Sequence, residues 1–345
     1  MTSLPANSAP RRPLIIGHRG TPGYRPEHSA SSYELAIALG ADALEPDVVA
    51  TRDRVLVLRH ENEIGGTTDV EQHPEFADRR TTKLIDGHEV TGWFTEDFTW
   101  AELSTLTLRE RIPDVRPDSA SFDGHERMLR LAELFDIVRT GSAEQGRRIG
   151  LVIEVKHPTY FAEIGMPLDE LLAAELAGSG FDSSTGLVIE CFELTVLEQL
   201  KKRGVDARYV YLLEKKGAPA DRVAADGKSA RPFADDLTDA GLDALAKRVD
   251  GISVDKSYLL PWTKPGKAVR DLVSRAHKRG LDVFTWTLRP ENVFLSKPNR
   301  RGDDRAAFGD WESEFAQIMG TGVDGVFADH TDLAVAARDA LNTEG

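Results

Sequence analysis

Short apolar runs alternate with amphipathic segments along most of the chain, and this pattern predicts alternating strands and helices. An apolar run bounded by polar residues is typical of a buried strand, whereas apolar positions that repeat every three or four residues are typical of a helix covering a core. The predicted strands span residues 14–17, 43–49, 149–155, 187–192, 207–213, 251–254, 281–287 and 323–328. The predicted helices span residues 29–39, 127–139, 168–177, 194–203, 237–247, 266–279, 310–319 and 331–341.

Eight such strand–helix units indicate an α/β fold and close most naturally into a (β/α)8 barrel. A doubly wound open sheet is the alternative, because periodicity alone does not distinguish an open sheet from a closed one. A barrel would form one domain from residue 14 to residue 345.

Residues 61–126 interrupt this alternation between the second strand and the second helix. The segment is polar and irregular and is too long for a simple loop. We predict an inserted subdomain that covers one end of the barrel and contains a short helix at residues 100–108. Residues 55–60 (VLVLRH), just before it, are expected to pair with the second strand as a hairpin. Residues 214–236 and 296–305 are predicted to be solvated loops.

The charge balance narrows the class of substrate. The 345-residue chain has 57 acidic and 43 basic residues, a formal net charge of −14, whereas nucleic-acid-binding domains are commonly basic. We therefore expect no nucleic-acid partner. A small phosphoester fits an acidic protein if cations and a metal ion are concentrated at one site.

Cysteine usage and the N-terminus bear on location. Residues 1–13 are polar and proline-containing, and we interpret them as a disordered leader with no recognisable signal peptide. The single cysteine, Cys191, excludes an intrachain disulfide and favours a reducing compartment. No apolar run approaches the ~18 residues that a membrane span needs. We expect a cytoplasmic monomer or homodimer without stable membrane insertion.

Polar side chains stand where several predicted strands end. They are His18 and Arg19, Glu45 and Asp47, His60, and Glu154 and Lys156. Residues two apart on a strand point to the same face, and in a barrel the carboxyl ends of all strands meet at the face where active sites lie. The sequence therefore predicts a single site built from four segments.

Glu45, Asp47 and Glu154 form the candidate metal site. Three carboxylates in one pocket repel one another, and a divalent cation is the simplest way to keep all three ionised. Oxygen ligands favour Mg²⁺ or Ca²⁺. The alternative is that these carboxylates are buried partners of nearby cations.

His18 and His60 form the candidate proton-transfer pair, since histidine acts as acid or base near neutral pH. Arg19 and Lys156 are the candidate phosphate-binding cations, and Trp286 is a candidate wall of the pocket. The alternatives are hydrogen bonds to loops for the histidines and core packing for Trp286. Glu27 and His28 are interpreted as cap or loop residues, with a supporting role behind the site residues as the alternative. The remaining histidines, including His330, are interpreted as loop or surface residues.

These residues and the segments around them make the chain resemble the glycerophosphodiester phosphodiesterases that have a large insertion after the second barrel strand. The motifs are His18-Arg19-Gly20, Pro26-Glu27-His28-Ser29, Glu45-x-Asp47, His60, Glu154-x-Lys156, the segments 93–99 and 109–113, and the segments 287–292 and 322–329. The resemblance covers about residues 14–335.

The resemblance implies a TIM barrel that hydrolyses glycerophosphodiesters, such as glycerophosphocholine or glycerophosphoethanolamine, to sn-glycerol 3-phosphate and an alcohol. It also implies one divalent cation, Mg²⁺ or Ca²⁺, on Glu45, Asp47 and Glu154, with His18 and His60 as the acid–base pair.

Two positions depart from the pattern that is common in this family. Glu61 follows His60 where the family often has aspartate, and Glu190 stands where it often has glutamine. The added charge of Glu190 suggests a preference for cationic alcohols such as choline.

Two other functions are alternatives to glycerophosphodiester hydrolysis. One is a lysophospholipase D or sphingomyelinase D-like lipid phosphodiesterase, which needs an exposed apolar rim. The other is a non-catalytic glycerophosphodiester-binding protein.

Overall fold

The structure is a computed structural model that describes residues 12–260 and 271–341. The predicted leader, residues 1–13, lies outside the described residues except for its last two positions. The first part of the predicted helix 266–279 also lies outside them. Among the described residues, none of the helices combines the length and the apolar character that crossing a bilayer requires.

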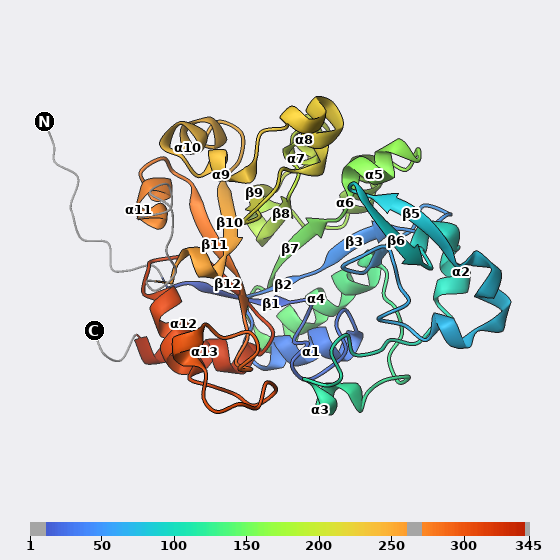
Figure 1. Ribbon diagram of the computed structural model, residues 1–345, viewed down its shortest axis with the longest axis horizontal. Coiled ribbons are helices and arrows are strands. Elements are labelled where there is room, and N and C mark those ends of the chain that lie inside the picture. Colours follow the sequence, from blue (N-terminus) through green and yellow to red (C-terminus); the bar gives the residue numbers. More distant parts are fainter. Residues whose placement is uncertain (1–11, 261–270, 342–345) are drawn as a thin grey trace, which may run out of the picture.

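The core of the molecule is a closed barrel of parallel strands (Figure 1). In barrel order the strands are β1 (Leu14–His18), β2 (Ala43–Glu45) with β3 (Asp47–Ala50), β7 (Gly150–Val155), β8 (Leu187–Cys191), β9 (Arg208–Leu213), β10 (Gly251–Asp255), β11 (Asp282–Leu288) and β12 (Gly325–Ala328). Closure is complete because β12 pairs with β1 and β2 pairs with β7. The (β/α)8 prediction is confirmed, and the open sheet is excluded.

One predicted strand is divided in two. Residues 43–49 are interrupted at Pro46, which has no N–H to donate to a neighbouring strand. Both halves nevertheless pair with β7, so β2 and β3 together occupy one position in the barrel. The predicted hairpin is confirmed, because β4 (Leu56–Leu58) pairs antiparallel with β3.

The helices lie outside the strands (Figure 1). Those that follow the predicted pattern are α1 (Ala30–Ala38), α4 (Leu131–Gln145), α6 (Leu168–Leu176), α7 (Leu194–Lys202), α10 (Asp239–Leu245), α11 (Leu272–His277), α12 (Trp311–Met319) and α13 (Thr331–Leu341). The barrel interior is filled by side chains from the strands, namely Ile16, Ala43, Val152, Val210, Phe284 and Phe327. A larger apolar layer packs between strands and helices.

Residues 61–126 lie beside the barrel (Figure 1). They contain the hairpin of β5 (Thr81–Ile85) and β6 (His88–Gly92) and the short helices α2 (Trp100–Leu103) and α3 (Pro117–Ala120). The short helix predicted within residues 100–108 is α2, and Thr99 and Glu102 form the capping box that starts it.

The loop prediction for residues 214–236 is wrong, because α8 (Ala220–Asp226) and α9 (Phe233–Asp236) lie there. Phe233 is 4% exposed and supplies apolar contacts to this segment. The charged composition of the segment, on which the loop prediction is based, gives no indication of these contacts. The remaining short helix is α5 (Pro158–Glu163).

The start of α1 offers a direct test of stability. The hydroxyl of Ser29 accepts a hydrogen bond from the Ser32 N–H at 3.2 Å. We expect Ser29→Ala to lower the free energy of unfolding by about 1 kcal/mol, because one N–H of the first turn loses its partner. Urea titration measures the change. Ser31→Ala is the matched control, since the Ser31 hydroxyl has no hydrogen-bond partner among the described residues. An equal loss in both variants would contradict the cap.

Candidate active site

The polar residues at the strand ends lie around one cavity of about 420 Å³. Strand register explains why they meet. His18 is level with Glu45 on the neighbouring strand, and Glu154 is level with both Asp47 and Glu190. Seven of the eight predicted site residues line the cavity, and Asp47, which is 0% exposed, lies beneath its surface.

A group of buried carboxylates forms the base of the site. One oxygen from each of Glu45, Glu154 and Glu190 lies within 4.8 Å of the other two. Oxygens Oε1 of Glu45, Oδ1 of Asp47 and Oε2 of Glu190 are buried without a hydrogen-bond partner among the described residues. Unpaired buried oxygens are costly, and a cation bound between them would satisfy them. These residues therefore fit a divalent metal ion.

The pKa values of Glu45, Glu154 and Glu190 are raised, as expected for buried carboxylates that repel one another. Burial, with Asp47 and Glu154 nearby, raises the pKa of Glu45 well above its usual range. Burial raises the pKa of Glu154 to about 7 despite Lys156, and burial next to Glu154 raises that of Glu190. Without a metal ion, it is therefore unfavourable for all three carboxylates to be ionised at once.

Asp47 differs from the other three carboxylates. Its Oδ2 accepts a hydrogen bond from His28 Nε2 at 3.0 Å and lies 3.3 Å from Arg19 Nε, while Lys156 Nζ lies 3.6 Å from its Oδ1. Although burial opposes it, Lys156 with His60 and Arg19 holds the pKa of Asp47 well below its usual range. Asp47 is thus anionic, and it anchors the cations around the site.

His18 is oriented from behind by Asp329. Its Nδ1 lies 2.6 Å from Asp329 Oδ1, so Nε2 is the nitrogen available to a substrate. The other Asp329 oxygen accepts hydrogen bonds from Arg116 Nη2 at 2.7 Å and Arg289 Nε at 2.6 Å. Burial, reinforced by Arg19, lowers the pKa of His18 to about 4.

His60 is oriented in the same way by Glu61. Its Nδ1 lies 2.5 Å from Glu61 Oε1, and Arg111 Nη2 donates to Glu61 Oε2 at 2.7 Å. Arg111 also donates to both oxygens of Glu27, at 2.7 and 2.8 Å. Desolvation by the cavity walls lowers the pKa of His60 to about 3. At neutral pH both histidines are therefore uncharged before a substrate or metal ion binds.

Two arginines of the segment 61–126 therefore hold the carboxylates that orient the two histidines. Arg111 holds Glu61, and Arg116 holds Asp329. Sequence reasoning did not identify either arginine or Asp329. Asp329 directly follows strand β12 (Gly325–Ala328). Its position at the carboxyl end of a strand was therefore a signal that could have identified it, as it identified Glu45.

Three residues interpreted as cap, loop or surface residues do lie outside helices and strands, but they are buried. Glu27 is 4% exposed and within hydrogen-bond distance of Arg19 and Arg111. His28 is fully buried between Asp47 and Tyr33. His330, interpreted as a loop or surface residue, is 2% exposed. The contact of Glu27 with Arg111 spans 84 positions, and periodicity does not reveal the shorter-range contacts of Glu27 and His28 either.

The predicted phosphate-binding cations already have partners. Lys156 Nζ donates to Glu154 Oε1 at 2.6 Å, and Arg19 Nη1 donates to Glu27 Oε2 at 3.1 Å. Both still line the cavity. Trp286 lines it as well and packs edge-on against Phe192, with ring centroids 5.9 Å apart. The site thus combines carboxylates, two anchored histidines, two cations and an aromatic wall.

Several known proteins are similar to this chain over most of its length. The model of the glycerophosphoryl diester phosphodiesterase family matches residues 18–333. The chain is 30% identical to glycerophosphodiester phosphodiesterase GDPD6 of Arabidopsis thaliana over 93% of this chain and 84% of that protein. It is 27% identical to a glycerophosphodiester phosphodiesterase of Treponema pallidum over 84% of each protein.

A solved structure shares the fold. It is an Oleispira antarctica phosphodiesterase in complex with the product sn-glycerol-3-phosphate, with a TM-score of 0.61 and 18% identity over 95% of this chain and 97% of that one. With a family model that matches nearly the whole chain, this protein belongs to the glycerophosphoryl diester phosphodiesterase family.

Proposed function

We propose that the protein hydrolyses glycerophosphodiesters to sn-glycerol 3-phosphate and an alcohol by histidine acid–base catalysis beside a divalent metal ion. The observation that carries this proposal is the pair of histidines whose Nδ1 atoms are each held by a carboxylate, at 2.6 Å for His18 and 2.5 Å for His60. Such anchoring fixes the orientation of both rings and leaves Nε2 for proton transfer.

The metal ion would bind Glu45 and Glu154 together with Asp47 or Glu190. Asp47 completes the set expected from the sequence, and Glu190 completes the group whose oxygens lie close together. When bound, Mg²⁺ or Ca²⁺ supplies positive charge that stabilises the negative charge developing on phosphate and glycerol oxygens.

The surroundings of the two histidines suggest different roles. Burial, with Arg19 and Lys156, lowers the pKa of His60, and Asp47 opposes this shift, so Lys156 and Asp47 are among the charged neighbours of His60. His18 lies on the side of Arg289, through their shared partner Asp329. We infer that His60 is the base beside the bound glycerol and that His18 is the acid beside the departing alcohol.

The proposed reaction has two steps. His18 enters this step as an imidazolium that takes up a proton when the anionic phosphodiester binds, with Asp329 holding its Nδ1–H. His60 takes the proton of the glycerol 2-hydroxyl while the oxygen of that hydroxyl attacks the phosphorus, and His18 gives its Nε2 proton to the alcohol oxygen as the bond between phosphorus and that oxygen breaks. Water then opens the resulting 2,3-cyclic phosphate with the histidine roles exchanged, which leaves sn-glycerol 3-phosphate. Arg19 and Lys156 stabilise the phosphate oxygens in both steps. Normal turnover of a 2-deoxyglycerol analogue would replace this route by direct attack of water.

A substrate panel tests the proposal. We expect release of glycerol 3-phosphate from glycerophosphocholine and glycerophosphoethanolamine, and little cleavage of lysophosphatidylcholine or sphingomyelin. The large apolar side chains exposed among the described residues are Leu14, Leu84, Ile164, Val223 and Phe308, and none of them lines the cavity. Preferential cleavage of the lipids would replace the proposal by the phospholipase D alternative. Binding of glycerophosphocholine without cleavage would favour the binding protein.

Arg116 is expected to act as a positioning residue. In Arg116→Gln, Asp329 loses one of its two arginine partners and holds His18 less rigidly. We expect kcat to fall about tenfold with little change in KM, since misplaced catalytic groups mainly affect the transition state. Steady-state kinetics on glycerophosphocholine measure both constants. Arg139→Gln, at an exposed position on α4, is the matched control. A rise in KM alone would show that Arg116 acts on substrate binding.

A further inference from the structure

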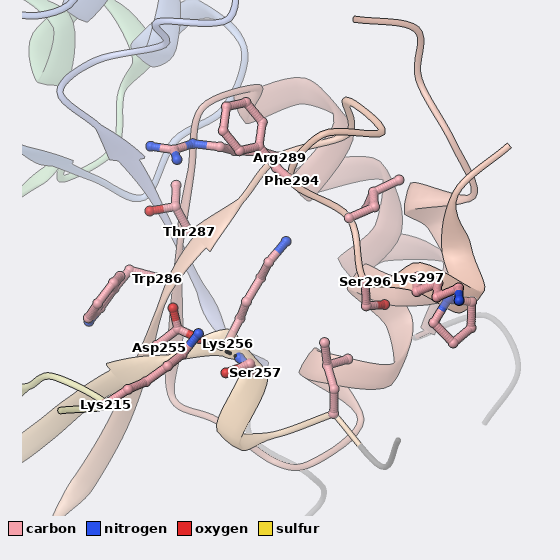
Figure 2. A pocket seen from close by; sticks show the side chains of 13 residues that line it. Lys215, Asp255, Lys256, Ser257, Trp286, Thr287, Arg289, Phe294, Ser296 and Lys297 are labelled. Atoms are coloured by element: carbon pink, nitrogen blue, oxygen red, sulfur yellow. Dashed lines mark hydrogen bonds and ion pairs between the residues drawn. The ribbon is translucent and has the colours of Figure 1, made fainter. Parts of the chain in front are cut away.

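A second cavity adjoins the catalytic one and is the larger of the two, at about 620 Å³. Trp286, Thr287 and Arg289 line both cavities, so the two are continuous along the carboxyl end of β11. The other walls of the second cavity come from Lys215 after β9, from the end of β10 and the residues up to Leu260, and from residues 294–298. Figure 2 shows these side chains from close by.

This second cavity is rich in cations. Lys215, Lys256, Lys297 and Arg289 line it, and Asp255 is the one carboxylate that residues 12–260 and 271–341 contribute to its lining. Figure 2 shows the ammonium end of Lys256 projecting into the space between Thr287 and Ser296.

Buried carboxylates behind the lining offset part of this charge. Glu314, which is 0% exposed, accepts a hydrogen bond from Lys256 Nζ at 2.7 Å. Asp329 accepts from Arg289. Asp255 lies 2.8 Å from Lys215 Nζ. Within the described residues Lys297 has no carboxylate partner, so the surface that faces the cavity remains net positive.

The direction of the reaction places the leaving group here. If His60 and the carboxylates hold the glycerol side, the alcohol departs on the side of His18 and Arg289, which borders the second cavity. The second cavity, of about 620 Å³, extends the catalytic cavity of about 420 Å³ and so gives a large alcohol additional room. Phe294 and Leu295 supply apolar contacts for carbon atoms of the alcohol.

We propose that the second cavity binds the alcohol part of the substrate and selects alcohols that carry a second phosphate group. This inference rests on the proposed function and names its substrate class. Lysine ammonium groups bind phosphate as point charges. Ser257 and Ser296 line the same space, and the Ser296 hydroxyl donates to the buried Glu314. Choline would place a fixed positive charge among three lysines, which is unfavourable.

This inference opposes the expectation that Glu190 selects cationic alcohols. Glu190 lies in the catalytic cavity among the carboxylates, and it does not line the second cavity. A carboxylate that helps to bind a metal ion has little charge left to attract choline. The two hypotheses therefore predict opposite orders of substrate preference.

Steady-state kinetics on four substrates separate the possibilities. They are glycerophosphoglycerol, its analogue with a terminal phosphate on the alcohol glycerol, glycerophosphoinositol 4-phosphate, and glycerophosphocholine. We expect kcat/KM to be at least about tenfold higher for the phosphorylated alcohols than for glycerophosphoglycerol, and this ratio to shrink as salt screens the lysines. The two phosphorylated substrates distinguish a glycerol phosphate chain from an inositol phosphate as the source.

Variants test whether the lysines cause the preference. In Lys215→Gln/Lys297→Gln we expect the ratio of kcat/KM for the phosphorylated to the unphosphorylated substrate to fall about tenfold, as two charge-assisted contacts are lost. Because the ratio is taken within one protein, a general loss of folded enzyme cancels. Lys216→Gln, beside Lys215 but outside the cavity lining, is the matched control.

Either of two results would overturn the inference. One is equal kcat/KM for the phosphorylated and unphosphorylated alcohols in the wild type, or a preference for glycerophosphocholine. The other is a ratio that does not change in the double variant. Failure of the proposed function looks different, because then glycerophosphoglycerol itself is not hydrolysed.

Discussion

Replacing His60 or His18 by glutamine is expected to lower kcat for glycerophosphocholine by about 10²- to 10⁴-fold, the usual contribution of a general acid or base. Each ring has its Nδ1 held by a carboxylate, at 2.5 Å for His60 and 2.6 Å for His18. Glutamine preserves polarity and approximate size but transfers no proton at neutral pH. Steady-state kinetics with the purified variants measure the loss.

The double variant adds a second criterion. Because the histidines act in the same step, we expect the loss in the double variant to be much smaller than the product of the single losses. His277→Gln is the matched control, since His277 lies on α11 and pairs with Asp324 outside the cavity. A kcat within about threefold of the wild type in either single variant would exclude that histidine from proton transfer.

Replacing Glu45 by glutamine is expected to abolish both metal binding and activity. Adding Mg²⁺ or Ca²⁺ to the metal-free wild type should stabilise the fold by about 2.7 kcal/mol at one hundred times the dissociation constant. A bound cation satisfies the buried oxygens that have no partner, which include Glu45 Oε1. Glutamine replaces one of these oxygens and removes a charge, so the stabilisation should be lost. Thermal unfolding with and without the ion measures it.

Stability of the metal-free variant distinguishes a metal site from a structural one. Glu45 lies close to Glu154 and Glu190, so removal of its charge relieves repulsion. We expect metal-free Glu45→Gln to be at least as stable as the metal-free wild type. Glu71→Gln, at an exposed position, should keep the full metal effect. A large loss of stability in the metal-free Glu45→Gln variant would show that Glu45 is mainly a structural partner.

Local patterns in the sequence sufficed to predict the barrel and half of the residues that line the catalytic cavity. Strand and helix periods are local properties, and eight repeats of one unit restrict the topology to very few arrangements. His18, Glu45 and Glu154 could be placed together because the carboxyl ends of parallel strands meet at one face. Their register in the structure agrees with that rule.

Long-range partners could not be predicted in this way. Arg116 meets Asp329 across 213 positions and Arg111 meets Glu27 across 84, and no periodicity encodes such pairs. The structure also brings Glu190 into the carboxylate group, because register sets it level with Glu154. The sequence marked Glu190 only as a departure from the family pattern.

The insertion shows the same limit. Its polar, irregular sequence indicated a cover for one end of the barrel. The structure shows a more specific arrangement, in which Arg111 and Arg116 hold the carboxylates behind both histidines. This link to the active site explains the burial of Arg116 in a segment with little regular structure.

The most direct test is the release of sn-glycerol 3-phosphate from a glycerophosphodiester by the purified protein, followed with EDTA and then with Mg²⁺ or Ca²⁺ in excess. The account predicts no release in EDTA, restored release with the metal ion, and none with the His18→Gln/His60→Gln variant. Release that continues in EDTA, or that persists in this variant, would contradict metal-assisted histidine catalysis at this site.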